Sequence, residues 1–259
     1  MKLFFRETGE GMPLIILHGL WGASENWLLV ARMLGEQFRV ILPDLRNHGQ
    51  SPHSEAMDYA CMSDDIATFI QNLALPEPPA IVGHSMGGKV VMTLLLTQPE
   101  LVGKAVIVDV APITYPFDAR GEHARVMDFI STCRLSTFST RTALTEAIRE
   151  QFQEEHLQQL LLKNVRKTSS GWEWKVNPQA LKQHMTGLLG FPEKLPLARY
   201  EKEVLFIQGA NANYIPDYSC LHPLFPAARL LRVEDSGHWI HAEQPERLAQ
   251  TIETFLIAP

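Results

Sequence analysis

Residues 82–90, VGHSMGGKV, place a serine between an apolar run and a helical pattern. Gly83 and Gly87 lie two positions either side of Ser85, where the backbone of a sharp strand-to-helix turn passes too close for side chains. Gly88 allows the following helix to pack tightly against the strand. The segment therefore predicts a buried strand, a strained turn that presents Ser85, and a helix whose N-terminus directs amide donors toward that serine.

A phosphate-binding loop is the competing interpretation, because Gly83-x-x-x-x-Gly88-Lys89 matches most of that motif. Such a loop needs Ser or Thr after the lysine to bind Mg²⁺, and Val90 stands there. No acidic metal partner is marked out, and the loop follows a later strand of the domain, whereas phosphate loops usually follow the first. The sequence favours a nucleophilic serine.

Short apolar runs alternate with amphipathic stretches in the first 111 residues and again after residue 200. Continuous apolar strands that alternate with helices predict a mostly parallel sheet with helices on both faces. We expect strands at 13–18, 38–43, 79–84, 104–109, 203–208 and 228–233, and helices at 24–35 (with Ser24 as N-cap), 59–75, 86–98 and 245–256.

Residues 112–200 interrupt this alternation with helical patterns at 141–152, 154–165 and 178–189 and a short extended piece at 171–176. We predict a core of residues 1–111 and 201–259 and a helical cap, or lid, of residues 112–200, inserted after the strand that follows the serine turn. A helical subdomain without contact to any site is the alternative. Cap residues that could line an acyl pocket, or equally form the core of the cap, are Phe129, Phe138, Trp172, Trp174, Met185 and Leu188.

A nucleophilic serine needs a base, and His238 is the best candidate. It lies in a short glycine-containing loop (236–239) directly after the last expected strand, where it can reach the carboxyl edge of a parallel sheet. His84, next to Ser85, should point away from it and be structural. His241 forms His-x-x-His with His238, but no third ligand motif is visible, so no metal site is expected.

The oxyanion of an acyl-transfer intermediate is held by backbone amides. The first should be Met86 N–H, directly after the serine. The second should be Leu20 N–H, in the glycine-rich segment His18–Gly22 after the first expected strand. An ordinary turn at His18–Gly19 is the alternative.

HGLWG, PDLRNHGQS, VGHSMGG, IVDVAP and SGHWIHAEQP occur in the order and spacing of α/β-hydrolases. The sequence resembles that superfamily over nearly the whole chain outside the cap, and within it the bacterial esterases of the YbfF type. The resemblance implies the α/β-hydrolase fold and esterase activity on short acyl esters, with acyl-CoA thioesters as a further substrate class.

The acid partner of the base departs from the usual plan of this superfamily. Its usual position, in the loop 209–213, is occupied by Ala212. Asp109 ends the strand that follows the serine turn, and in a parallel sheet it would lie at the same edge as the serine; the resemblance also implies Asp109. Asp217, Asp235 or no acid at all are the alternatives.

These residues predict a serine hydrolase that cleaves carboxylic esters through an acyl-enzyme. The missing carboxylate at Ala212 leaves a catalytically silent binding protein as an alternative, and a carbon–carbon bond hydrolase could use the same three side chains. Lys163, Arg166 and Lys167 could contact a coenzyme A phosphate or form a solvated helix face. No cofactor is suggested, and the oligomeric state is not predicted.

Charge and cysteine usage limit the partners and the location. The formal net charge of −6 disfavours nucleic acid as a partner, and no apolar run is long enough to span a membrane. Three widely spaced cysteines and an early-charged N-terminus predict a cytoplasmic protein that acts on a small-molecule acyl ester.

Overall fold

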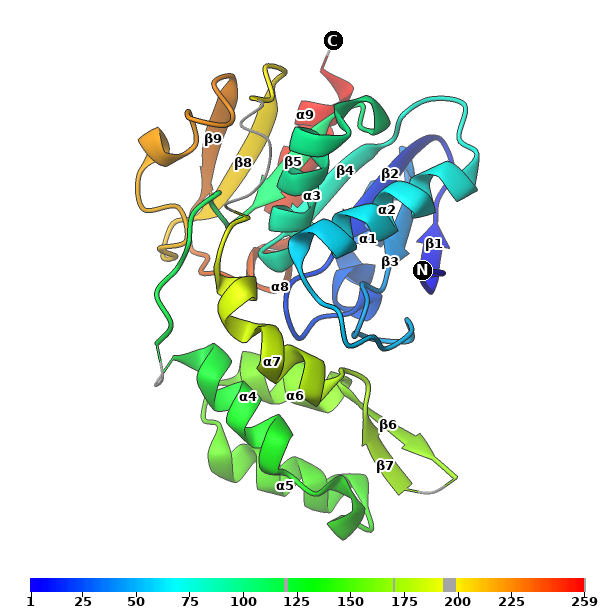
Figure 1. Cartoon of the computed structure of the whole chain (residues 1–259), viewed down its shortest axis with the longest axis vertical. Helices are drawn as coiled ribbons and strands as arrows, with labels where there is room; N and C mark the ends of the chain where they lie inside the picture. Colours follow the sequence, from blue (N-terminus) through cyan, green and yellow to red (C-terminus); the bar gives the residue numbers. More distant parts are fainter. Residues whose placement is uncertain (119–120, 170, 193–198, 259) are drawn as a thin grey trace.

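The computed structural model describes residues 1–118, 121–169, 171–192 and 199–258. Its centre is a seven-stranded sheet with the order β1-β3-β2-β4-β5-β8-β9 (Figure 1). Only β1 pairs antiparallel, with β3, while the other pairs in this sheet are parallel. The strands are β1 (Phe5–Thr8), β2 (Met12–Leu17), β3 (Phe38–Pro43), β4 (Ala80–His84), β5 (Ala105–Val108), β8 (Val204–Gly209) and β9 (Ala228–Val233).

Helices cover both faces of this sheet. On one face α2 (Tyr59–Leu73) packs beside α3 (Met86–Thr97), and on the other α1 (Leu28–Leu34) packs against α9 (Pro245–Ile257). The central strands are buried on both sides, and their side chains divide between two apolar clusters, one for each face. This confirms the predicted architecture, which is the one that the α/β-hydrolase resemblance implies. Short elements complete the core: η1 (Ser24–Trp27), η2 (Pro99–Leu101), η4 (Tyr218–Cys220) and α8 (Ile240–Glu243).

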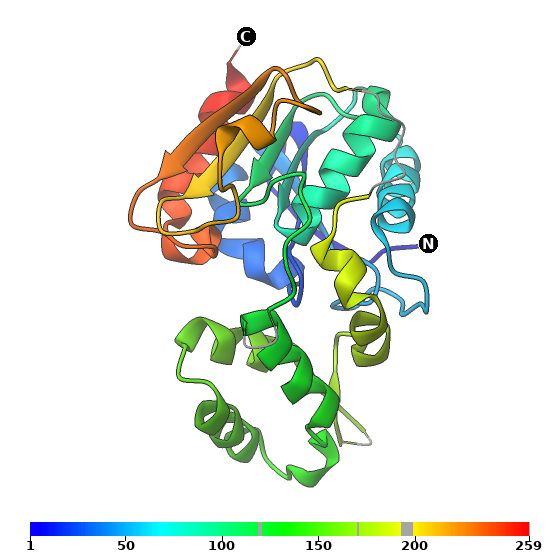
Figure 2. The same cartoon turned by 60° about the vertical axis from the view of Figure 1, so that its left-hand side comes forward.

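The segment between β5 and β8 forms a separate helical layer at one end of the core (Figures 1 and 2). It contains α4 (Glu122–Thr132), η3 (Leu135–Thr137), α5 (Arg141–Gln151), α6 (Glu155–Lys163), the hairpin β6 (Val165–Thr168) and β7 (Gly171–Trp174), and α7 (Pro178–Leu189). We call this layer the cap. Residues 193–198 of the predicted cap lie outside the described residues.

Lys89, on α3, holds both connections between the cap and the core. Its Nζ donates to the carbonyl oxygens of Ile113 at 2.9 Å, Leu189 at 2.8 Å and Gly190 at 2.6 Å. Three acceptors match the three N–H bonds of a charged ammonium, although burial lowers the pKa of Lys89 to about 7. The ring of Tyr115 lies 4.5 Å from the ammonium and adds a cation–π contact. The chain therefore enters and leaves the cap beside one buried lysine.

Three details differ from the sequence predictions. Ser24 is not an N-cap: η1 begins at Ser24 with Ala23 as its cap residue, and the Ser24 hydroxyl instead accepts from Arg6 Nε at 3.2 Å. The helix predicted over 154–165 ends at Lys163, because Val165 begins β6. Strands β1 and β6 and helices α4 and α8 were not predicted. No helix in the described part of the chain combines the length and apolar character needed to cross a membrane.

Candidate active site

Ser85 lies in a strained turn between β4 and α3. Its φ of 52° and ψ of −117° are unusual for a residue with a side chain, and strain of this kind costs about 1–3 kcal/mol. The flanking glycines make the turn possible. A Cβ at Gly83 would lie 2.4 Å from Gly87 O, and one at Gly87 would lie 2.6 Å from the carbonyl oxygens of both Leu17 and His18. The close backbone approach expected from the glycine spacing is therefore present.

The structure brings Ser85, His238 and Asp109 into one hydrogen-bonded chain. Ser85 Oγ lies 3.1 Å from His238 Nε2, and His238 Nδ1 lies 2.7 Å from Asp109 Oδ2. Sheet register explains the meeting, because His84 at the end of β4 pairs with Val108 at the end of β5. Ser85 and Asp109 thus follow neighbouring strands at one edge, and the loop after β9 carries His238 over that edge.

The surroundings of the three side chains favour a neutral His238 imidazole, which can accept a proton. Burial lowers the pKa of His238 below its usual value of 6.5. Burial raises the pKa of Asp109, while the hydrogen bond from Gly209 N–H to Asp109 Oδ1, at 3.0 Å, opposes that rise. Gly209 N–H donates to Oδ1, and Oδ2 accepts the Nδ1–H of His238. The imidazole proton is therefore on Nδ1, which leaves Nε2 free to accept the proton of Ser85.

Two further side chains hold His238 in place. His84 Nε2 donates to the backbone carbonyl of His238 at 2.9 Å. His84 therefore supports the loop that carries His238, which is a structural role. The ring of Tyr214 stacks on the imidazole with centroids 3.8 Å apart. Tyr214 was missed by the sequence analysis, and the only available signal was its place in the loop after β8 that lacks the usual acid.

The other acid candidates lie away from the imidazole. Asp217 is exposed and accepts the N–H of Ser219 at 2.7 Å. Asp235 is exposed on the surface, 3.9 Å from Arg247. Among the described carboxylates, Asp109 is the one that bonds to His238.

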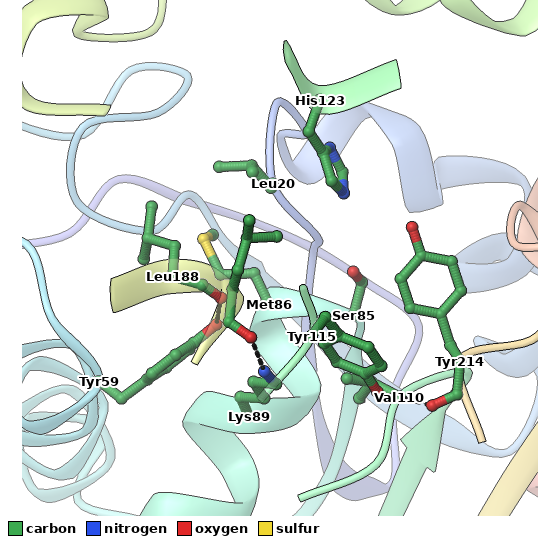
Figure 3. A pocket seen from close by; sticks show the side chains of 11 residues that line it. Leu20, Tyr59, Ser85, Met86, Lys89, Val110, Tyr115, His123, Leu188 and Tyr214 are labelled. Atoms are coloured by element: carbon green, nitrogen blue, oxygen red, sulfur yellow. Dashed lines mark hydrogen bonds between the residues drawn. The ribbon is translucent and has the colours of Figure 1, made fainter. Parts of the chain in front are cut away.

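Leu20 and Met86 line the same cavity as Ser85 (Figure 3). Leu20 occupies a tight turn closed by Gly22 N–H and Gly19 O at 3.0 Å, and Trp21 takes a φ of 64° there. Neither Leu20 N–H nor Met86 N–H donates to another group in the described part of the chain. Both amides therefore lack a partner within the described residues and belong to residues that line the cavity beside Ser85.

The space around Ser85 has an inner and an outer part. The inner cavity measures about 20 Å³, enough for about one water molecule, and is lined by Ser85 and Met86 together with Tyr59, Lys89, Val110 and Leu188. The outer opening measures about 490 Å³ and is lined by His238 together with residues of the α4 and β8 loops. His123, Tyr115, Leu189 and Tyr214 line both parts.

Most of the predicted pocket residues of the cap lie elsewhere. Of the six, only Leu188 lines the Ser85 cavity. Phe129 and Phe138 line a separate groove on the cap, and the ring of Phe129 packs edge-on against Trp174. The sequence shows that these six residues are apolar. It could not show which side of the cap faces the core.

The basic residues considered for coenzyme A lie mainly on the hairpin of the cap. Arg166 forms an ion pair with Glu173 on the neighbouring strand, and Lys167 lies over the Trp172 ring. Lys163 lines a different groove, between α6 and α8. The described residues contain no cluster that could hold a metal ion, and the ring of His241 stacks on Trp27 with centroids 4.8 Å apart.

Known proteins resemble this chain over nearly its full length. An alpha/beta hydrolase family matches residues 14–251. The sn-1-specific diacylglycerol lipase ABHD11 of Danio rerio is 34% identical, with 97% of this chain and 80% of that protein aligned. Esterase YbfF of Escherichia coli is 31% identical over 99% of both chains. A solved structure, a marine microorganism esterase, is 33% identical with a TM-score of 0.92, covering 98% of this chain and 99% of its own. The chain belongs to the alpha/beta hydrolase family.

Proposed function

We propose that the protein is a serine hydrolase that cleaves carboxylic esters through an acyl-enzyme intermediate. The observation that carries the proposal is the continuous chain of hydrogen bonds from Ser85 through His238 to Asp109. The esterase and lipase names of its relatives support the same chemistry. The predicted cytoplasmic location remains part of this proposal.

Each residue has a separate role in the proposed reaction. His238 Nε2 takes the proton of Ser85 as the oxygen attacks the ester carbonyl. The N–H groups of Leu20 and Met86 donate to the oxyanion that forms. His238 then protonates the leaving alcohol, or the thiol of a thioester, and activates the water that releases the acid. Asp109 keeps the imidazole in its working tautomer and stabilises the imidazolium.

The two parts of the pocket suggest how an ester is oriented. His238, which must protonate the leaving group, lines the outer opening, whereas Ser85 and Met86 line the small inner cavity. We therefore place the acyl group inside and the alcohol outside. An inner cavity of about 20 Å³, which has room for about one water-sized group, supports acetyl as the acyl group. A long acyl chain would have to displace the side chains that line this cavity, among them Leu188 of α7.

Labelling with a fluorophosphonate probe tests the nucleophile. The wild-type protein should be labelled promptly, and Ser85→Ala should not be labelled. Ser136→Ala, at an exposed position on the cap, is the matched control and should be labelled like the wild type. A wild-type protein that resists the probe would favour the catalytically silent binding protein.

A substrate panel separates the remaining alternatives. We expect p-nitrophenyl acetate to be cleaved faster than p-nitrophenyl octanoate, and both to depend on Ser85. Acetyl-CoA tests thioester cleavage, for which the hairpin basic residues offer little support. Cleavage of a ring-fission diketone but of no ester would replace our proposal with carbon–carbon bond hydrolysis.

A further inference from the structure

His123 is a cap residue at the junction of the inner cavity and the outer opening. It is the second residue of α4 and lines both spaces, so it lies near both Ser85 and His238. Figure 3 shows its ring directed from the cap toward the space between Ser85 and Tyr214. The proposed triad and oxyanion donors leave this histidine without a function.

The hydrogen bonding of His123 fixes which ring nitrogen carries its proton. Trp21 Nε1–H lies 3.2 Å from His123 Nδ1, and an indole nitrogen can only donate. Nδ1 must therefore accept, which places the proton of the neutral ring on Nε2. Burial lowers the pKa of His123 and so favours the neutral form. Within the described residues, no group accepts a hydrogen bond from this Nε2–H.

Tyr214 brings a second neutral polar group to the same place. Its hydroxyl points toward His123 in Figure 3, and its own ring lies on His238. Burial raises the pKa of Tyr214 to about 12, so the hydroxyl keeps its proton at neutral pH. Two neutral donors thus lie on the side of the pocket where His238 must protonate a leaving alcohol.

We propose that His123 is a specificity-determining residue whose Nε2–H donates to a neutral oxygen in the alcohol part of the substrate. The preferred substrates would be esters whose alcohol carries a hydroxyl, ether or carbonyl oxygen close to the scissile bond. Plain alkyl esters would leave the His123 donor without a partner in a partly closed site, which costs binding free energy. This inference rests on the proposed ester hydrolysis.

Matched substrates test the proposal in the wild-type protein. Propyl acetate and 2-hydroxyethyl acetate have the same number of heavy atoms and differ in one hydroxyl, and butyl and 2-methoxyethyl acetate differ in one ether oxygen. We expect kcat/KM to be about 2- to 12-fold higher for the oxygen-bearing member of each pair, the range that one net hydrogen bond supplies. The ether pair matters because an ether oxygen can only accept.

Two variants then assign the preference to His123. His123→Phe should reduce both kcat/KM ratios toward one, since it keeps a ring and removes the donor. His123→Gln should restore a ratio above one, since its amide can accept from Trp21 and donate into the pocket. Fluorophosphonate labelling of both variants reports whether the site is folded.

The outcomes separate this inference from the proposed function. A wild-type protein that cleaves none of the four esters and resists the probe refutes the esterase itself. A protein that cleaves all four with ratios near one refutes the role of His123 without any variant. Ratios above one that persist in His123→Phe assign the preference to another group and equally overturn the inference.

Discussion

Replacing Asp109 with asparagine tests the triad most directly. Asp109 accepts two hydrogen bonds, from His238 at Oδ2 and from Gly209 N–H at Oδ1, in a side chain that is fully buried. An asparagine has only one acceptor oxygen. If that oxygen keeps Gly209 N–H, its NH₂ faces His238 Nδ1, which must then accept. The imidazole proton moves to Nε2, and Ser85 loses its base.

The flipped asparagine does not rescue the site. It would offer its oxygen to His238 but set its NH₂ against Gly209 N–H, leaving two buried donors facing each other at a cost of about 1–3 kcal/mol. We therefore expect the first arrangement and a loss of turnover of about 10⁴-fold, by analogy with the same change in serine proteases. This corresponds to about 5.4 kcal/mol of transition-state stabilisation at 1.36 kcal/mol per tenfold.

The assay measures kcat/KM for an unactivated ester such as propyl acetate, with the released acid as the readout. Asp217→Asn is the matched control, since Asp217 is exposed and caps η4, and it should keep wild-type turnover. An Asp109→Asn variant within tenfold of wild type would refute the tautomer reasoning. Loss of turnover in Asp217→Asn instead would show that the acid was assigned wrongly.

Three other changes have defined outcomes. Gly87→Ala should lower the thermal midpoint and the fluorophosphonate labelling, because the new Cβ would lie 2.6 Å from two backbone oxygens. Gly187→Ala on α7 is the control: its Cβ meets nothing within 4 Å, so it should be neutral or stabilising by up to about 1 kcal/mol. Equal effects of the two variants would contradict the close-approach argument. Burial lowers the pKa of His48 and of His241 below 6.5, so below that pH the unfolded chain binds more protons at these two residues. The free energy of unfolding should therefore fall as pH drops, by up to about 1.4 kcal/mol per unit for each histidine. Urea titrations at several pH values measure this, and a flat profile would contradict it. Lys89→Met removes the donor shared by the two cap connections, so limited proteolysis should cut residues 112–200 faster than in the wild type; unchanged cleavage would show that the cap is held by other contacts.

The central strands of the core were predictable because their apolar runs are buried on both faces of a parallel sheet. Strand β1 was missed since it is a four-residue edge strand with alternating exposed residues. Helix α4 starts after Gly121 without a side-chain cap, so no N-cap signal marked its beginning. The cap pocket was predicted poorly, with one lining residue of six, because helical periodicity shows which face is apolar but not what that face meets.

Local spacing in the sequence determined the serine turn and the two amides beside it. Gly83 and Gly87 are needed because neighbouring backbone approaches each of them too closely for a Cβ. Both lie within two residues of Ser85, so their spacing can be recognised in the sequence alone. The choice of Asp109 over Asp217 had a sequence argument, but only the tertiary structure joined it to His238, 129 residues later in the chain.

Tertiary structure alone decided the contacts of Lys89, Tyr214 and His123. Lys89 belongs to a phosphate-loop-like string in the sequence, yet its ammonium binds carbonyls of two segments about 24 and 100 residues away. The proton position of His123 depends on an indole 102 residues earlier. Hydrogen bonds of this range arise from how the cap lies on the core, and no periodicity or local motif records them.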